Sequence, residues 1–271
     1  MTSTTSTANK MTVPGLARMK AEQQPITMLT AYDASFARLV DASGVDCVLV
    51  GDSLGNVIQG LDNTLGVSVD HMVYHVAAVR RGLNRALLVA DLPFLAYHDR
   101  ASALASSGRL VQAGAEMVKL EGGAALAPQV TALVEQGIPV CAHLGLTPQH
   151  VHQLGGYRVQ GREASVAERL KADAHALEDA GAGLLVLECV PAVLAREVAA
   201  ALRIPVIGIG AGAQVDGQVL VVYDVLGISP PPRPRFVKDF MADHGDIGTA
   251  LAAYVEAVRT GAFPGAEHTY R

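Results

Sequence analysis

The chain has 271 residues, of which 50% are hydrophobic and only 17% are charged, and its formal net charge is −5. A mildly acidic chain with 4% aromatic residues and no Trp lacks the basic surface and the stacking side chains of a nucleic-acid-binding protein. No apolar run approaches the roughly 18 to 20 residues that a membrane-spanning helix needs, so the high hydrophobic fraction predicts a large buried core.

The first eleven residues, Met1–Met11, are rich in Ser and Thr and contain no apolar segment of the kind found in signal peptides. We predict a disordered tail over residues 1–11 and one folded domain over residues 12–271. The three cysteines, Cys47, Cys141 and Cys189, are odd in number and lack a paired spacing. They are best interpreted as reduced core thiols of a cytoplasmic protein.

From Gln24 onward, short apolar runs alternate with segments of helical periodicity. The runs are rich in Val, Leu and Ile and do not alternate with polar residues, which is typical of strands buried on both faces. We predict strands at 26–29, 47–50, 86–90, 117–120, 139–142, 184–187, 206–209 and, less regularly, 219–226. Helical patterns lie between them, and further helices are predicted within 12–23 and over 246–258.

A weak internal repeat supports this alternation. Three segments run from a glycine through a strand to an acid, and they are Gly44 to Asp52, Gly114 to Glu121, and Gly181 to Glu188. A glycine that ends a helix just before a strand is typical of βαβ units and a parallel sheet. About eight such units in a chain of this length predict a single (β/α)₈ barrel, and an open doubly wound sheet is the alternative.

Polar residues stand at the carboxyl ends of five predicted strands, where barrel enzymes place their catalytic groups. A single buried acid at a strand end is unremarkable, but five polar groups from five strands indicate a functional site. These residues are Asp52, Asp91, Glu121, His143 and Glu188.

Three of these acids predict a metal site. Asp52, Asp91 and Glu121 follow consecutive strands and would repel one another in a dry pocket. Mg²⁺ resolves such repulsion, and it takes one or two carboxylates together with substrate oxygens and water. Lys119 lies two residues before Glu121 on the same strand, so both point into the barrel. In the alternative interpretation, one acid pairs with Lys119 and only two contact the metal.

Glu188 stands across the barrel from these acids and is a candidate general base, its pKa raised by apolar surroundings. The candidate roles of His143 are a metal ligand, an acid–base group and a hydrogen-bond donor to the substrate, and we predict that it contacts the substrate. By strand alternation Cys189 points away from Glu188 and is structural. The glycine run 208–212 fits either a phosphate-binding loop or a tight turn between a strand and a helix.

Eight segments, in order and covering the chain from about Met11 to the PGAEH sequence at 264–268, resemble the ketopantoate (3-methyl-2-oxobutanoate) hydroxymethyltransferase family. Any one of them is modest evidence, but the ordered set is highly specific. The segments are LTAYDASFA (29–37), VGDSLGNVIQG (50–60), ADLPF (90–94), VKLEGG (118–123), HLGLTPQ (143–149), GGYRVQGR (155–162), LECVP (187–191) and IGIGAG (207–212).

The resemblance implies a (β/α)₈ barrel of the phosphoenolpyruvate/pyruvate type that uses Mg²⁺ and takes the one-carbon unit from 5,10-methylenetetrahydrofolate. It places metal and substrate contacts on Asp52, Ser53, Asp91, Lys119 and Glu121, and the proton acceptor on Glu188. It also implies self-association, usually as a homodecamer, and a role in pantothenate synthesis. The proline-rich stretch at 229–235 departs from the pattern expected for the family.

The chemistry expected from these assignments begins with loss of the C3 proton of 3-methyl-2-oxobutanoate to Glu188. The metal stabilises the enolate, Ser53 and Lys119 hold the substrate carboxylate, and the enolate carbon attacks the folate methylene carbon. A Mg²⁺-dependent oxo-acid lyase or mutase on the same barrel is the second enzyme interpretation, and it needs no folate. A non-catalytic metabolite-binding or scaffold barrel is the third, although it does not require the four acids to be present together.

Overall fold

Eight short parallel strands form the centre of the computed structural model, which describes residues 10–271. They pair in chain order, and β8 pairs with β1 to close the barrel. This confirms the predicted (β/α)₈ barrel and excludes the open sheet. The strands are β1 (Ile26–Thr30), β2 (Cys47–Val50), β3 (Leu87–Asp91), β4 (Met117–Glu121), β5 (Val140–Gly145), β6 (Leu184–Glu188), β7 (Val206–Ile209) and β8 (Gly217–Leu220).

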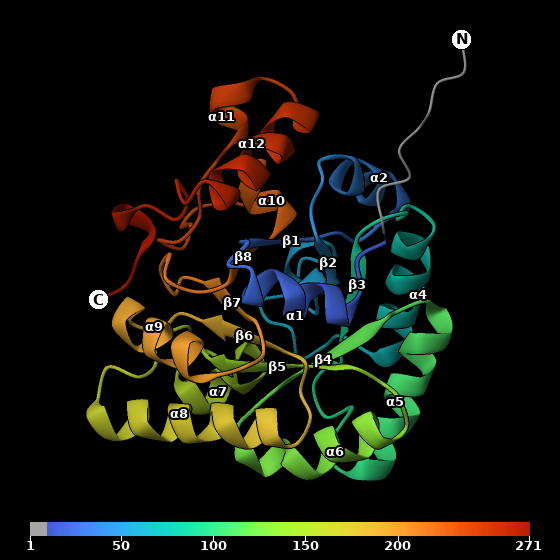
Figure 1. Cartoon of the computed structure of the whole chain (residues 1–271). Helices are drawn as coiled ribbons and strands as arrows, with labels where there is room; N and C mark the ends of the chain where they lie inside the picture. Colours follow the sequence, from blue (N-terminus) through green and yellow to red (C-terminus); the bar gives the residue numbers. More distant parts are fainter. Residues whose placement is uncertain (1–9) are drawn as a thin grey trace.

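Helices surround the barrel, and α1 lies across its amino-terminal end (Figure 1). Residues 210–216 join β7 to β8 without a helix, so one of the expected units lacks its helical half. The helices are α1 (Val13–Ala21), α2 (Ala34–Ala42), α3 (Leu54–Val57), α4 (Val69–Arg80), α5 (Arg100–Ala113), α6 (Ala127–Glu135), α7 (Val151–Leu154), α8 (Ala164–Asp179), α9 (Ala192–Ala201), α10 (Val222–Val225), α11 (Met241–His244) and α12 (Ile247–Arg259), with 3₁₀ turns η1 (Ala124–Leu126), η2 (Pro148–His150) and η3 (Ala266–His268).

The predicted last strand, 219–226, is wrong in its second half. The strand β8 ends at Leu220, and α10 begins at Val222. The backbone N–H of Val222 donates to the Thr30 hydroxyl at 3.0 Å instead of continuing the sheet. Both elements are buried, and a continuous apolar run does not distinguish a buried strand from a buried helical turn.

Helix ends follow the expected chemistry. The Asp246 side chain accepts from the Thr249 N–H at 3.0 Å at the start of α12, as its predicted capping position requires. Gly114 ends α5 with a φ of 116°, a left-handed conformation that disfavours any residue with a Cβ. The repeat noted in the sequence therefore corresponds to a helix end, a turn and a strand.

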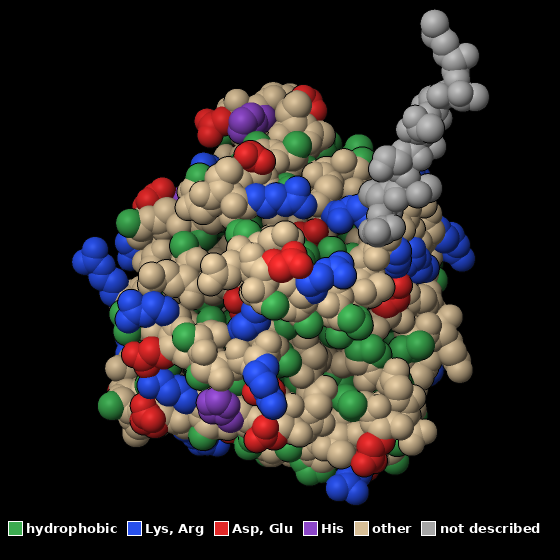
Figure 2. Space-filling model, in the orientation of Figure 1, with side chains coloured by type: hydrophobic (Ala, Val, Ile, Leu, Met, Phe, Trp, Pro, Cys, Tyr) green, Lys and Arg blue, Asp and Glu red, His purple; other side chains and the backbone are tan. Residues whose placement is uncertain are grey.

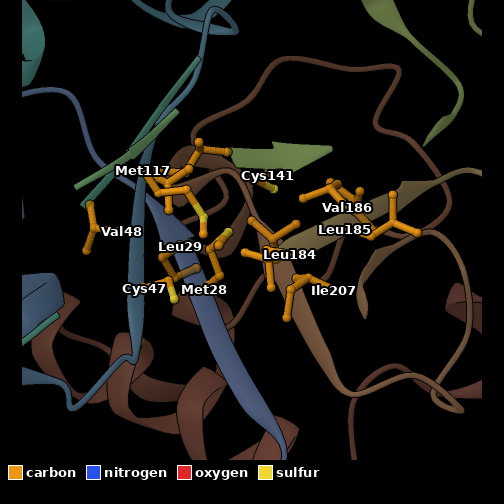
Figure 3. Packing of buried hydrophobic residues seen from close by; sticks show 14 of the residues in the cluster. Met28, Leu29, Cys47, Val48, Met117, Cys141, Leu184, Leu185, Val186 and Ile207 are labelled. Carbon is orange, nitrogen blue, oxygen red and sulfur yellow. The ribbon is translucent and has the colours of Figure 1, made fainter. Parts of the chain in front are cut away.

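The side chains inside the barrel change from apolar to polar toward the carboxyl ends of the strands. Met117 is followed on the same face of β4 by Lys119 and then Glu121, because side chains two apart share a face. Figure 3 shows Met28, Met117 and Leu184 gathered near the centre of the barrel with Cys47 and Cys141. All three cysteines are buried free thiols, as predicted. The apolar half of the interior thus supports a polar half at the carboxyl ends.

On the face seen in Figure 2, acidic and basic side chains are interspersed. Across residues 10–271, no helix combines the length and the apolarity needed to cross a bilayer. Residues 1–9 of the predicted tail lie outside the described part of the chain. At its end, Lys10 pairs with Glu116 at 2.7 Å, and the Met11 N–H donates to the Arg85 carbonyl at 2.8 Å.

At the amino-terminal end of the barrel, Asp46 joins β1 to β2. Its Oδ2 atom accepts from the backbone N–H of Thr27 at 2.9 Å and from its hydroxyl at 2.8 Å, while Oδ1 lies 3.5 Å from Arg85 and 3.6 Å from Arg259. Asp46→Asn removes the charge of a buried carboxylate that accepts from Thr27 and faces two arginines, and we expect it to lower the free energy of unfolding by about 1 to 3 kcal/mol. Urea-induced unfolding measures the loss.

The matched control is Asp62→Asn, because Asp62 is an exposed acid. This control is expected to unfold like the unsubstituted protein. Equal unfolding midpoints for the two variants would show that the Asp46 contacts contribute nothing to stability.

Candidate active site

One cavity of about 690 Å³ opens at the carboxyl ends of the strands. The structure brings together in its lining all seven residues singled out from the sequence. These are Asp52, Ser53, Asp91, Lys119, Glu121, His143 and Glu188. They come from the ends of β3 to β6 and from the turn between β2 and α3, so the closure of the barrel is what makes them neighbours.

Lys119 is the cation at the centre of this group. Its Nζ atom lies 2.9 Å from Asp91 Oδ1 and 3.7 Å from Glu121 Oε1, and its side chain is only 5% exposed. Burial alone would lower the pKa of Lys119, but the surrounding carboxylates outweigh it and raise that pKa. The lysine therefore stays protonated, and it offsets part of the negative charge of the acids.

Asp52 has the freer carboxylate of the first two acids, because only its Oδ2 atom accepts a hydrogen bond within residues 10–271. The Oδ2 atom of Asp91 accepts from the Asp52 N–H at 3.0 Å, and its buried Oδ1 atom lies 2.9 Å from Lys119 Nζ. Burial and the charges of Asp91 and Glu121 raise the pKa of Asp52 well above its usual range. Two close, buried carboxylates that disfavour joint ionisation suit a divalent cation, and an all-oxygen donor set suits Mg²⁺.

Glu121 is bound differently. Its Oε1 atom lies 3.1 Å from His143 Nδ1, and its Oε2 atom accepts from the Gln149 N–H at 3.0 Å. Both oxygens are therefore already engaged by the protein. Consistent with this, no three His, Cys, Asp or Glu side chains of the described chain are grouped as a metal-ligand set. The acid closest to Lys119 is Asp91 rather than Glu121, so the number of acids that contact the metal stays a prediction.

His143 links Glu121 to Glu188. Its Nδ1 atom faces Glu121, and its Nε2 atom lies 3.3 Å from Glu188 Oε2. Burial and the Lys119 charge oppose protonation of the imidazole, but the two carboxylates raise the pKa of His143 to about 9. Glu188 was expected in apolar surroundings, and the structure instead gives it a charged neighbour that orients its carboxylate.

Sequence reasoning missed Gln149, in the 3₁₀ turn after β5. Its side-chain Nε2 atom donates to Asp52 Oδ2 at 2.8 Å and to the Leu92 carbonyl at 3.0 Å, while Tyr97 donates to its Oε1 atom at 2.6 Å. Its backbone N–H binds Glu121, so one buried residue holds two of the acids. The HLGLTPQ segment contains it, but nothing in that segment alone points to Asp52.

Ser53 lies at the start of α3, beside Asp52. Its Oγ atom is 2.9 Å from the Tyr32 hydroxyl. Tyr32 is buried and stacks on Tyr223 with ring centroids 5.9 Å apart. A Cβ at Gly51 would come within 2.7 Å of Ser53 Oγ, so the glycine leaves space for this hydroxyl. Ser53 is thereby fixed at the edge of the cavity by a residue that the sequence did not single out.

The strand alternation from which the direction of Cys189 was predicted does not extend to this residue. Its φ of 48° ends the extended conformation of β6, so strand alternation no longer applies, and the residue lines the cavity next to Glu188. The glycine run packs closely against side chains, and it leads into β8 rather than into a helix. At Gly210 a Cβ would lie 2.9 Å from Phe236 and 3.0 Å from Tyr270.

Comparison with known proteins gives matches over nearly the whole chain. Residues 10–266 match the family model described as ketopantoate hydroxymethyltransferase. A 3-methyl-2-oxobutanoate hydroxymethyltransferase of Shewanella loihica is 57% identical over 97% of this chain and 99% of its own length. The protein of the same name from Aromatoleum aromaticum is 58% identical over 94% of this chain and 95% of its own length.

Solved structures show the fold. A phosphonopyruvate hydrolase in complex with oxalate and Mg²⁺ superposes with a TM-score of 0.61 at 11% identity, over 95% of this chain and 93% of that one. A 2,3-dimethylmalate lyase, described as a member of the PEP mutase/isocitrate lyase superfamily, gives 0.57 at 16% identity, over 93% and 99%. These likenesses show that the chain shares the barrel fold of those proteins.

Proposed function

The chain belongs to the ketopantoate hydroxymethyltransferase family of enzymes, and we propose that it transfers a hydroxymethyl group from 5,10-methylenetetrahydrofolate to C3 of 3-methyl-2-oxobutanoate. The products are 2-dehydropantoate and tetrahydrofolate, and water supplies the new hydroxyl group. This reaction would place the enzyme in pantothenate synthesis. The observation that carries the proposal is the convergence of four acids and Lys119 on one cavity.

In this proposal, Ser53 and Lys119 bind the substrate carboxylate at one side of the cavity. Glu188, at the opposite side and next to His143, removes the C3 proton. The C3 carbanion, as the enolate, then attacks the methylene carbon of the folate. Mg²⁺ held by Asp52 and Asp91 would act as a Lewis acid that stabilises the enolate.

Turnover with purified components tests this function. Product should form only when the oxo acid, methylenetetrahydrofolate and Mg²⁺ are all present. Consumption of the oxo acid without folate would favour the lyase or mutase alternative. No turnover, together with Mg²⁺ binding that does not respond to the oxo acid, would favour a non-catalytic barrel.

The metal assignment predicts that the loss of Mn²⁺ binding differs between variants of the three acids. Asp52→Asn and Asp91→Asn are expected to remove most Mn²⁺ binding, because each loses a direct ligand. Glu121→Gln is expected to weaken binding by about 10- to 100-fold, the usual effect of altering a group that orients ligands. Electron paramagnetic resonance of free Mn²⁺ measures all three variants. Equal losses would make Glu121 a direct ligand.

The family also predicts self-association as a homodecamer. Sedimentation velocity tests this against the 28.2 kDa mass of one chain. A single sedimenting species of monomer mass at working concentrations would contradict it.

A further inference from the structure

The outer part of the cavity, here called the cavity mouth, consists of Tyr157, Arg158, Arg233, Phe236 and Tyr270. These residues come from the loop between α7 and α8, from the proline-rich segment after α10, and from the carboxyl terminus. Three aromatic rings and two guanidinium groups therefore face the space above the acids.

The cavity is much larger than the proposed oxo acid requires. Its volume of about 690 Å³ is in the range that holds drug-sized ligands, whereas the oxo acid has only five carbons. Its lining also includes the apolar side chains of Leu49, Val186 and Ile209. A second, mostly flat ligand therefore has room between the acids and the cavity mouth.

Charge separates the two ends of this space. The acids lie at the bottom of the cavity, and the cations lie at the mouth. Arg233 is already compensated, because it lies 3.3 Å from Asp239 and its charge also acts on the buried Asp224. Within residues 10–271, the Arg158 side chain has no ion pair or hydrogen bond, and it is exposed at the cavity edge.

We infer that the cavity mouth is the subsite for the anionic tail of the folate, with Arg158 as the residue that binds its glutamate carboxylates. This inference rests on the proposed function. A reduced folate has a flat heterocycle at one end and a benzoyl-glutamate at the other. The acids repel the carboxylates and the mouth attracts them, so the one-carbon end is directed toward C3 of the oxo acid. The aromatic rings offer faces for the benzoyl group.

The test compares Arg158→Gln with Arg162→Gln, a matched control from the same loop whose Nε atom donates to the carbonyl of Arg271 at 3.3 Å. We expect Arg158→Gln to raise the KM for methylenetetrahydrofolate about fivefold, the effect of losing one exposed charge pair. The KM for the oxo acid and the exchange of its C3 proton with deuterium, which needs no folate, should stay unchanged. Arg158→Lys should recover part of the loss.

Salt gives a second readout, one that a merely structural role would not affect. Added salt should raise the folate KM of the unsubstituted enzyme toward that of Arg158→Gln, because it screens exposed charges. A folate KM that is the same in Arg158→Gln and Arg162→Gln, or a parallel loss of C3 exchange, would overturn the inference. Absence of folate-dependent turnover in the unsubstituted enzyme, with C3 exchange intact, would overturn the proposed function and this subsite with it.

Discussion

Glu188→Gln is expected to abolish exchange of the C3 proton of 3-methyl-2-oxobutanoate with solvent deuterium while leaving binding of the oxo acid largely intact. Glu188 is the acid that does not pair with Lys119. Its neighbour is His143, whose Nε2 atom lies 3.3 Å from Glu188 Oε2. A glutamine keeps the shape of the side chain but accepts no proton. Loss of a positioned general base lowers the rate by about 10²- to 10⁴-fold.

The readout is nuclear magnetic resonance of the C3 proton in deuterated buffer with Mg²⁺ and without folate. Binding of the oxo acid is measured separately by calorimetry, so that loss of the base is distinguished from loss of the site. Glu163→Gln, at an exposed acid just before α8, should exchange like the unsubstituted enzyme. Exchange at the unsubstituted rate in Glu188→Gln would remove Glu188 as the base.

Local patterns were sufficient to predict the acids that come from strands. Glu121 and Glu188 each end an apolar run, so a prediction of the strand also places the side chain at the carboxyl-terminal end of the barrel. The spacing of Lys119 and Glu121 then fixes their shared direction. Closure of the sheet in chain order then gathers these side chains at one site, because it brings the ends of neighbouring strands together.

Gln149 was not predictable in this way. It lies in a 3₁₀ turn rather than in a strand, and its partner Asp52 is 97 positions away in the sequence. A loop glutamine has no periodicity that indicates its direction. Its role depends on the path of the chain after β5, and only the folded structure shows that path.

Acids at the amino-terminal end of the barrel show a second limit of prediction from local sequence. The Asp46, Glu116 and Asp216 carboxylates accept the backbone N–H groups of Thr27, Leu88 and Val206 in the preceding strands. In sequence these acids stand just before strands and look as polar as those just after them. Position alone separates the two sets: acids at the amino ends satisfy backbone donors, and acids at the carboxyl ends face the cavity.

Gln149→Met is expected to weaken Mn²⁺ binding by about 10- to 100-fold, because residues that orient metal ligands have effects of this size. Methionine has a similar length and fits a buried site, but it cannot donate to Asp52 Oδ2. In the native arrangement that bond, at 2.8 Å, fixes the carboxylate and leaves its other oxygen available. Without it, Asp52 retains its raised pKa and loses the donor that favours its ionised form.

The backbone N–H of residue 149 still binds Glu121 in this variant, so the Glu121–His143–Glu188 arrangement should persist. Saturating Mn²⁺ should therefore restore most C3 exchange in Gln149→Met, but none in Glu188→Gln. Gln153→Met, at an exposed position in α7, is the matched control and should bind Mn²⁺ normally. If Gln149→Met bound Mn²⁺ as tightly as Gln153→Met, Asp52 would be held in place by something other than Gln149. If saturating metal failed to restore exchange, Gln149 would act on the base as well as on the metal end of the site.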